Sequence, residues 1–370
     1  MIGSGPKALQ RLREQFDWPL VVGCLFILAI GLVNLYSATR VAKGNLFSQQ
    51  LAFLGLGVIA FIVVAAVDYR VYERLAPVIF GACLLQLLAV LAFGKNVNGS
   101  KRWLGVASLG IQPSELMKVG VIIILAKLGS DEPTELRRRG LPLVLSMVGL
   151  LIVPVGLIYL QPDLGTALLL YVIGFSMILL MPLWWLHKVE AFFIAPLLAL
   201  LRLSFGLKAY QKKRLMTFID PSSDPLGAGF HARQSVYAIG SGRWTGKGWL
   251  HGTQNQLQFL PEHWTDFPFA VWAEEWGLVG SLVLIGAYLF VILWALGVSA
   301  TARDRFGQLL ALGVACLLFW HVVVNIGMVT SVLPVVGVTL PLVSYGGSSL
   351  LTVMIALGLL MNVSIRRYAY

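Results

Sequence analysis

The sequence predicts an all-α polytopic membrane protein of about ten transmembrane helices, with one large extracytoplasmic loop between the seventh and eighth spans. Of the 370 residues, 58% are hydrophobic and only 12% are charged, whereas soluble chains carry roughly a quarter charged residues. A spanning helix needs about 20 apolar residues, so ten helices use roughly 200 positions and leave the others for loops and tails. This composition excludes a single membrane anchor that carries a large soluble domain.

Ten apolar runs are candidate spans. The first follows the polar, basic segment 1–17, and we interpret it as a spanning helix rather than a signal peptide because no small-residue cleavage site follows it. The three cysteines, Cys24, Cys83 and Cys316, lie inside apolar runs without pairing spacing, which favours packing over disulfides or metal binding. The candidate spans cover residues 18–38, 48–67, 75–94, 113–129, 141–160, 164–181, 188–205, 266–297, 307–330 and 347–365.

The distribution of Lys and Arg predicts the orientation. Ten spans put both termini on one side, where the tails and short loops carry 14 basic residues against 5 in the short loops of the other side. Short cytoplasmic loops are enriched in Lys and Arg, so we expect both termini in the cytoplasm. Half of the 28 basic residues behind the net charge of +11 are therefore topology signals, and no nucleic-acid partner is predicted.

The segment 206–265 is long enough to form a structure of its own outside the membrane. It contains Asp-Pro turns at 220–221 and 224–225 and is rich in glycine from 227 to 252. Apolar residues between Phe230 and Ile239 recur at helical spacing, which predicts a short helix in the membrane interface. We treat residues 1–370 as one membrane domain that contains this loop.

Residues 240–248 read Gly-Ser-Gly-Arg-Trp-Thr-Gly-Lys-Gly, which is similar to a phosphate-binding loop. The pattern fails twice, because Ser241 takes the position of the first glycine and Gly248 replaces the Ser or Thr that would hold magnesium. The outer side is also the wrong compartment for ATP. A glycine-rich backbone with Arg243 and Lys247 can still bind an anion, although a tightly turned surface loop is the simpler interpretation.

Glu115 and Lys118 lie one turn apart on the fourth span. A charge inside a bilayer costs several kcal/mol unless it is paired or wet, so we expect an internal ion pair beside a cavity. A pocket for a substrate headgroup and a purely structural pair both fit these two residues, and neither function excludes the other.

Two further polar positions lie near the outer ends of spans. Arg102, with Lys101 and Trp103, forms a basic and aromatic cluster that fits a lipid phosphate, although an ordinary interface belt is the commoner explanation. Asp163 opens the sixth span, where helix capping is the simpler role. It is also in position to line the same outer cavity.

Asp266 opens the eighth span at the end of the long outer loop. Thr265 or Asp266 could cap this helix, but partial burial would also make the Asp266 carboxylate a usable proton acceptor. Glu262 is its nearest acidic neighbour, and Glu274 and Glu275 lie deeper in the span, where a buried acid is functional or paired. We rank Asp266 first as the candidate general base.

The histidines are weaker candidates. His231 and His263 have no spacing that supports a two-histidine metal site, and His187 and His321 lie at or within spans, where we expect local hydrogen bonds.

Five sequence motifs occur along the chain. They read Gln-Pro-Ser-Glu at 112–115, Gln-Pro-Asp-Leu-Gly-Thr at 161–166, two Asp-Pro pairs and Leu-Gly-Ala-Gly within 220–229, Gly-Lys-Gly at 246–248 with Phe-Leu-Pro-Glu at 259–262 and Thr-Asp-Phe at 265–267, and Pro-Leu-Val-Ser-Tyr-Gly-Gly-Ser at 341–348. With these motifs the chain resembles the SEDS family (shape, elongation, division, sporulation) from the first span to the tail. The stretch at 248–254 and the short N-terminal tail are more similar to its rod-shape members than to its division members.

The resemblance implies a ten-span peptidoglycan glycosyltransferase that polymerises lipid II on the outer face of the bacterial cytoplasmic membrane. It implies a partner, a class B penicillin-binding protein that cross-links the new strand, together with other membrane proteins of the elongation machinery. Asp266 matches the family's essential aspartate, and Glu115 and Lys118 match the pair that lines its central cavity.

In the reaction expected, the 4-hydroxyl of the incoming GlcNAc attacks C1 of the MurNAc at the reducing end of the growing chain, and undecaprenyl diphosphate leaves. Inversion at C1 needs one base, for which Asp266 is the candidate, and no covalent intermediate. The leaving diphosphate needs positive charge, either from a divalent cation such as Mg²⁺ or Mn²⁺ or from basic side chains. The outer candidates are Arg102, Arg214, Arg243 and Lys247, and we expect two or three of them to bind the substrate.

Two other functions compete. A lipid II flippase would also have ten spans, an internal charged pair and a basic outer surface, but it needs polar residues along a route through the bilayer. A non-catalytic scaffold for the penicillin-binding protein would explain the outer loop. It would leave Asp266 and the Glu115–Lys118 pair without a role.

Overall fold

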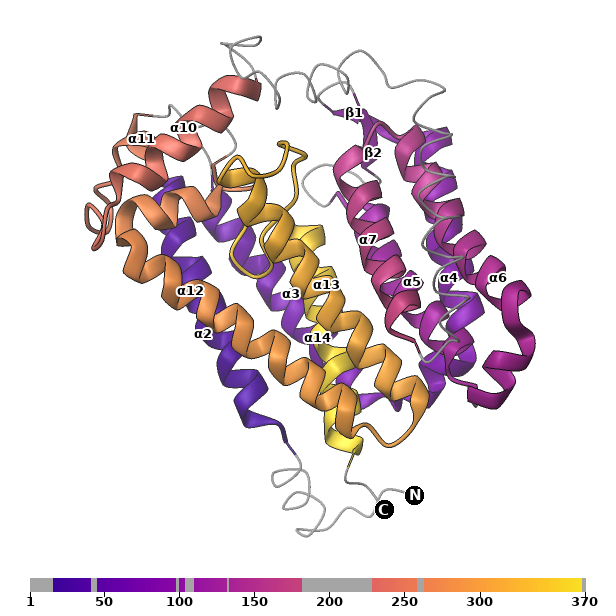
Figure 1. The fold of residues 1–370 in the computed structure, drawn as a ribbon. Helices are drawn as coiled ribbons and strands as arrows, with labels where there is room; N and C mark the ends of the chain where they lie inside the picture. The colour runs from indigo at the N-terminus through magenta and orange to yellow at the C-terminus, as the bar shows by residue number, and fades with distance from the viewer. Residues whose placement is uncertain are drawn as a thin grey trace.

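The computed structural model of the protein describes residues 16–40, 45–97, 100–103, 110–131, 133–181, 228–257 and 263–367. Over these ranges long helices run between the two ends of a bundle (Figure 1). The helices are α2 (Trp18–Thr39), α3 (Leu46–Ala66), α4 (Tyr69–Phe93), α5 (Pro113–Gly129), α6 (Pro133–Leu160), α7 (Leu164–Leu180), α10 (Ala228–Ser241), α11 (Thr253–Gln256), α12 (Pro268–Thr301), α13 (Arg305–Val329) and α14 (Gly347–Arg366). Two short strands, β1 (Lys95–Val97) and β2 (Ser100–Trp103), pair as an antiparallel hairpin.

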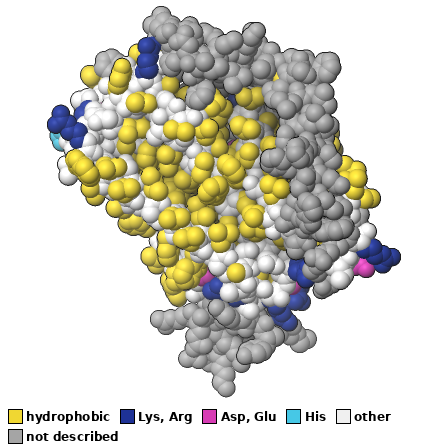
Figure 2. Space-filling model, viewed as in Figure 1, with side chains coloured by type: hydrophobic (Ala, Val, Ile, Leu, Met, Phe, Trp, Pro, Cys, Tyr) yellow, Lys and Arg dark blue, Asp and Glu magenta, His cyan; other side chains and the backbone are white. Residues whose placement is uncertain are grey.

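The surface of the bundle is apolar. Seven of the described helices are long and apolar enough to cross a bilayer, namely α2, α3, α4, α6 from Gly140 onward, α12, α13 and α14, and α7 is a shorter apolar helix. Large apolar side chains face outward, such as Ile59 at 60% and Leu85 at 67% exposure. Figure 2 shows hydrophobic side chains over the middle of the visible face and basic side chains toward its two ends. This surface suits lipid rather than water, and the prediction of an all-α polytopic membrane fold is confirmed.

Most of the predicted spans fall within the described residues. Nine of the ten are helices there, including the fourth, whose predicted bounds 113–129 are those of α5. The predicted span 188–205 lies outside the described residues, as does the whole of the loop segment 206–227 before α10. The short helix predicted around Phe230–Ile239 is confirmed as α10.

Three elements differ from the sequence prediction. Helix α4 begins at Tyr69 rather than at residue 75, because Asp68 caps it by accepting a hydrogen bond from Arg70 N at 3.0 Å, so a polar first turn is helical. Helix α6 extends back to Pro133 through a break at Gly140, where φ is 50° and ψ is −137°. The hairpin β1–β2 adds two short strands to a fold predicted as all helical, with Val97 paired to Ser100 in the antiparallel register.

The centre of the bundle is formed by α5, α13 and α14. Helices α13 and α14 are the most deeply buried of the seven spanning helices, and α5 is buried along almost its whole length. Helix α13 contacts α12, α5, α7 and α14. Side chains on α5 and α13 are therefore surrounded by protein rather than by lipid.

The first and the last spanning helix meet at one end of the bundle, where α2 begins and α14 ends (Figure 1). Asp17 is buried there, accepts a hydrogen bond from Trp294 Nε1 at 2.8 Å, and lies 3.4 Å from the Arg367 guanidinium. We call this the basic end of the bundle, since Arg305, Arg366 and Arg367 lie there. The candidate site residues lie at the opposite end.

Candidate functional site

The candidate site residues that the structure describes gather where α5, α7 and α12 begin, at the end of the bundle that carries α10 and the hairpin (Figure 1). The segment 330–346, between α13 and α14, lies at the same end. We call this end the site end. Arg214 and Glu262 lie outside the described residues.

Glu115 and Lys118 form the expected buried pair. Lys118 Nζ lies 2.8 Å from each carboxylate oxygen of Glu115, and the two residues are 0% and 7% exposed, respectively. Lys118 Nζ also lies 2.9 Å from His321 Nε2, and His321 Nδ1 lies 2.9 Å from Thr339 O. Because Nδ1 must donate to that carbonyl, Nε2 accepts from the ammonium and the imidazole is neutral.

His321 is the residue that sequence reasoning missed here. We expected it to be satisfied locally, and this is wrong, because its Nε2 bonds to Lys118 on α5, 203 positions away in the chain. A histidine inside an apolar run was the available signal in the sequence, but no sequence spacing links His321 to α5.

Asp163 both caps a helix and joins three elements. Its Oδ1 accepts a hydrogen bond from Thr166 N at 3.3 Å, which confirms the capping role in α7. Gln112 Nε2, just before α5, donates to Asp163 Oδ2 at 3.0 Å, and Arg102 Nη1 on β2 lies 3.7 Å from Oδ1. Arg102 also donates to Pro162 O.

The Arg102 side chain keeps part of its surface open. It is 31% exposed, whereas Asp163 is almost fully buried. Asp163 therefore orients Arg102 at the site end and leaves part of the guanidinium accessible to an anion.

Asp266 lies in the turn before α12 and is half-buried. Phe267 is the N-cap of α12 and Pro268 follows it, so the capping role weighed for Thr265 and Asp266 is wrong. The carboxylate of Asp266 faces Gly337, where φ is +73° and an added Cβ would lie 3.2 Å from Oδ2. A side chain at this position would crowd the carboxylate and would be strained at this φ, so glycine fits here.

The segment 330–346 is held to α13 beside Asp266. Asn325 Nδ2 lies 3.0 Å from Asp266 O and 2.6 Å from Val338 O. Thr339 Oγ1 and Ser349 Oγ, 2.7 Å apart, link the same segment to α14. Asn325 was not among the sequence candidates, because a single Asn in an apolar run carries no motif.

The glycine-rich stretch 240–248 packs against a break in α12. The break is at Gly277, where φ is 65° and ψ is −159°. Lys247 N donates to Glu274 O at 3.0 Å and Gly248 N to Glu275 O at 3.0 Å. These two N–H groups donate to carbonyls of α12 just before its break and are not available to an anion. This favours the structural interpretation of the loop over anion binding.

Lys247 and Arg243 have different surroundings. Lys247 Nζ lies 2.6 Å from Glu274 Oε1, which also accepts from Thr253 Oγ1 at 3.1 Å. Glu274 is fully buried, so Lys247 neutralises it. Arg243 is exposed and lines a groove of about 630 Å³ between α10, α12 and α13, together with Trp244.

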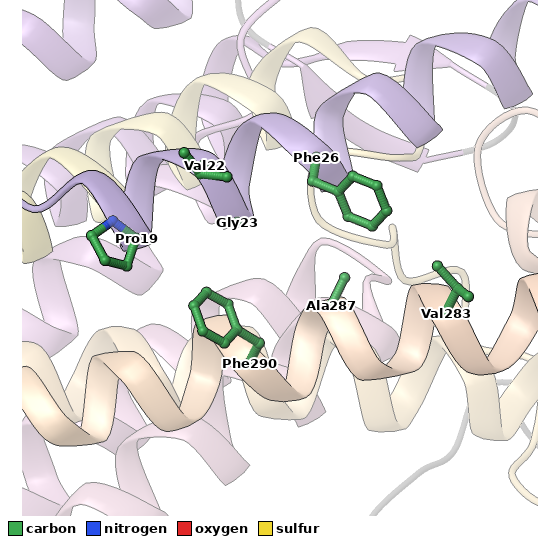
Figure 3. Close-up of a pocket in the computed structure, with 7 residues that line it drawn as sticks. All are labelled: Pro19, Val22, Gly23, Phe26, Val283, Ala287 and Phe290. Carbon is green, nitrogen blue, oxygen red and sulfur yellow. The ribbon is translucent and has the colours of Figure 1, made fainter.

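A second cavity carries no polar chemistry. It has a volume of about 320 Å³ and lies between α2 and α12, where Phe26 and Phe290 face it in Figure 3. All seven lining residues are apolar or glycine, and the cavity faces the lipid side of the bundle. It offers no group for catalysis.

The described residues contain no cluster of three or more His, Cys, Asp or Glu side chains that could hold a metal ion. The acidic groups nearest to the site do not share one position. Glu115 bonds to Lys118, Asp163 bonds to Gln112 and Thr166, and Asp266 lies in the turn before α12.

A family model described as "Cell cycle protein", FtsW/RodA/SpoVE, matches residues 18–369. The chain belongs to the FtsW/RodA/SpoVE family. This confirms the resemblance to the SEDS proteins. Peptidoglycan glycosyltransferase MrdB of Escherichia coli K12 is 42% identical over 358 residues, which cover 96% of this chain and 95% of that protein. Peptidoglycan glycosyltransferase RodA of Treponema pallidum is 33% identical, with 96% and 98% covered.

Solved structures agree with this assignment. A chain from a peptidoglycan synthase complex that coordinates polymerization and crosslinking has a TM-score of 0.81 and 34% identity, with 96% of this chain and 99% of that chain covered. The rod-shape-determining protein RodA of Thermus thermophilus has a TM-score of 0.69 and 31% identity, with 96% and 98% covered. The similarity to the rod-shape members of the family is thus confirmed in sequence and in fold.

Proposed function

We propose that this chain is a peptidoglycan glycosyltransferase that polymerises lipid II into glycan strands during cell elongation. The observation that carries the proposal is the half-buried Asp266, whose carboxylate faces Gly337 at the site end of a membrane bundle. The relatives named peptidoglycan glycosyltransferase cover nearly the whole chain, which supports the same activity.

In the proposed reaction Asp266 is the general base. The 4-hydroxyl of the incoming GlcNAc loses its proton to the Asp266 carboxylate as its oxygen attacks C1 of the MurNAc at the reducing end of the growing chain. The C1–oxygen bond to undecaprenyl diphosphate breaks, and the configuration at C1 inverts. One base is enough for this step, and Asp266 is the acidic residue proposed for it.

The departing diphosphate needs positive charge. Arg102 is supported as a ligand by its partly exposed guanidinium beside Asp163, and Arg243 by its exposure at the groove between α10 and α12. Lys247 is a weaker candidate because it neutralises Glu274. Arg214 remains a proposal on sequence alone.

A divalent cation, Mg²⁺ or Mn²⁺, is a further proposal for the same charge. The described residues offer no cluster of three or more His, Cys, Asp or Glu side chains for it, and the diphosphate itself would supply oxygen ligands. When bound, such a cation would neutralise the leaving group. Loss of polymerisation in EDTA, restored by added Mg²⁺ or Mn²⁺, would support it.

We propose that Glu115 and Lys118 support the substrate pocket on its side toward the middle of the bundle. Their burial and the neutral His321 argue for a rigid polar layer under the site end. A purely structural role remains the alternative for this pair, and direct contact with the lipid II headgroup would separate the two.

The proposed setting is the cytoplasmic membrane of a bacterium. Residues 1–370 form one membrane domain in this proposal, with both termini cytoplasmic, the loop 206–265 outside and the site end facing outward. The neighbour from a peptidoglycan synthase complex supports a cross-linking partner. We propose a class B penicillin-binding protein in this role, alongside other membrane proteins of the elongation machinery.

A flippase is the main alternative, and the packing below Lys118 argues against it. From Val119 to Ala126, α5 is apolar and buried, and α13 is likewise apolar and mostly buried from Leu309 to Leu318. Within the described residues, the polar layer at Glu115, Lys118 and His321 is therefore followed by apolar, packed stretches of α5 and α13. Transport of a charged headgroup would need polar groups along those stretches.

The test is polymerisation of purified lipid II by the purified protein in liposomes, with and without the penicillin-binding protein and with and without EDTA. We expect glycan strands, with the partner raising their yield. Transbilayer movement of lipid II without any glycan would support the flippase instead. Absence of both activities, with the partner still recruited, would support the scaffold.

A further inference from the structure

One side chain joins the two chain segments that meet at Asp266. Asn325 is fully buried in α13 and donates both hydrogens of its amide, one to Asp266 O at 3.0 Å and one to Val338 O at 2.6 Å. Asp266 belongs to the turn before α12, and Val338 belongs to the segment 330–346. A single amide group therefore sets the distance between these two backbones.

The orientation of this amide is determined by its surroundings. Both acceptors are backbone carbonyls, so the opposite orientation would bring Oδ1 against two oxygens. Among the described residues nothing bonds to Asn325 Oδ1, although the atom is buried. A buried acceptor without a bond destabilises a fold, so stability alone does not account for Asn at this position.

A second side chain, one helical turn earlier on α13, supports the same segment. His321 donates from Nδ1 to Thr339 O at 2.9 Å, while its Nε2 accepts from Lys118. Residues 338 and 339 are thus both attached to one face of α13. The residue before them, Gly337, is the one that faces the Asp266 carboxylate.

We propose that Asn325 is a positioning residue for Asp266. It holds the backbone of Asp266 against the segment that carries Gly337, and so directs the carboxylate toward the acceptor hydroxyl. His321 holds the next carbonyl of that segment and connects it to the Glu115–Lys118 pair. The inference rests on the proposed function of Asp266 as general base.

The test is steady-state polymerisation of lipid II by Asn325→Leu and Asn325→Ala in the purified full-length protein. Leu keeps the branched shape of Asn at a larger volume and without its donors, and Ala removes the donors without adding bulk. We expect kcat to fall about 10- to 100-fold, since small displacements of a catalytic group have effects of this size. KM for lipid II should stay within about twofold of the parent value, and the acidic limb of the pH–rate profile, which reports the base, should shift.

Ser235→Ala is the matched control. Ser235 is fully buried on α10 and donates from Oγ to Val329 O at 2.6 Å, so the variant also removes a side-chain bond to an α13 carbonyl. This bond ends at Val329 O rather than at Asp266 or Val338, so the kcat and KM of the variant should match those of the parent. A merely structural role for Asn325 would give the same result as this control.

Each outcome has a defined meaning when Asp266→Asn is measured in parallel. A folded Asn325→Leu or Asn325→Ala protein with a parental kcat, or with only KM changed, overturns the positioning role. If Asp266→Asn is inactive in that case, the proposed function stands and the inference alone fails. If Asp266→Asn polymerises normally, the proposed role of Asp266 as general base is wrong, and the positioning role of Asn325, which rests on it, is wrong as well.

Discussion

Lys118 carries a positive charge at a position with no solvent exposure. Its ammonium has three hydrogens, and three acceptors surround it, the two Glu115 oxygens at 2.8 Å and His321 Nε2 at 2.9 Å. The desolvation of such a charge is compensated only while all three bonds are in place. At the scale of single residues, this site is therefore sensitive to the loss of any one member.

Replacing Lys118 with Met should destabilise the protein by about 3–5 kcal/mol, because Glu115 would remain buried without its counter-ion. Thermal unfolding in detergent measures the change. Arg138→Gln is the matched control, since Arg138 and Glu135 form another pair three residues apart whose side chains are 79% and 50% exposed. Such exposed pairs contribute little, so the control should unfold like the parent, and an unchanged melting temperature for Lys118→Met would argue that the central pair is in contact with water.

At the scale of elements, the broken helix α12 and the loop 240–248 depend on each other. Leu278 N and Val279 N, just past the break, donate to Arg243 O at 2.9 Å and Trp244 O at 3.1 Å. The loop in turn donates to carbonyls before the break. The backbone N–H and C=O groups that the break and the loop leave without partners in their own segment thus bond to the other segment, as buried backbone groups require.

Gly246→Ala should separate these two elements. Gly246 has a φ of +80°, and an added Cβ would lie 2.1 Å from Glu275 O, a backbone atom that cannot easily move. We expect a loss of about 1–3 kcal/mol and faster hydrogen exchange at the amides of Leu278 and Val279. Gly240→Ala is the control, because a Cβ there meets nothing within 4 Å, and parental exchange rates in Gly246→Ala would contradict the proposed contact.

The sequence predicts these elements only in part, for physical reasons. Apolar length and periodicity determine spans, so α5 and α13 were predictable to within a few residues. The break in α12 at Gly277 was not predicted, because a single glycine in a long apolar run does not by itself distinguish a broken helix from a continuous one. The bond between Lys118 and His321 depends on packing between α5 and α13, which no local pattern reports.

At the scale of the whole molecule, polar groups are separated into two layers. The site end carries Glu115, Asp163 and Asp266, and the basic end carries Asp17 with Arg366 and Arg367. The helices between them are mostly apolar. Motifs at 112–115, 161–166 and 265–267 predicted which residues would share the site end, because all three precede helices that start there.

The orientation of these layers in the membrane can be measured with single cysteines. Thr245→Cys lies on an exposed loop at the site end, and Arg138→Cys lies on the exposed start of α6. In intact spheroplasts a membrane-impermeant maleimide should label Thr245→Cys at once and Arg138→Cys only after permeabilisation. The parent protein is the control for its own three cysteines, and the reverse labelling pattern would contradict an outward-facing site.

The central claim is that Asp266 is the base of a lipid II polymerase, and Asp266→Asn tests it most directly. Asp68→Asn is the matched control, because Asp68 caps α4 and Asn is an equally good cap. We predict that the parent and Asp68→Asn produce glycan strands from purified lipid II, whereas Asp266→Asn keeps its melting temperature and partner binding and produces none. Glycan of normal length and yield from Asp266→Asn would contradict the account.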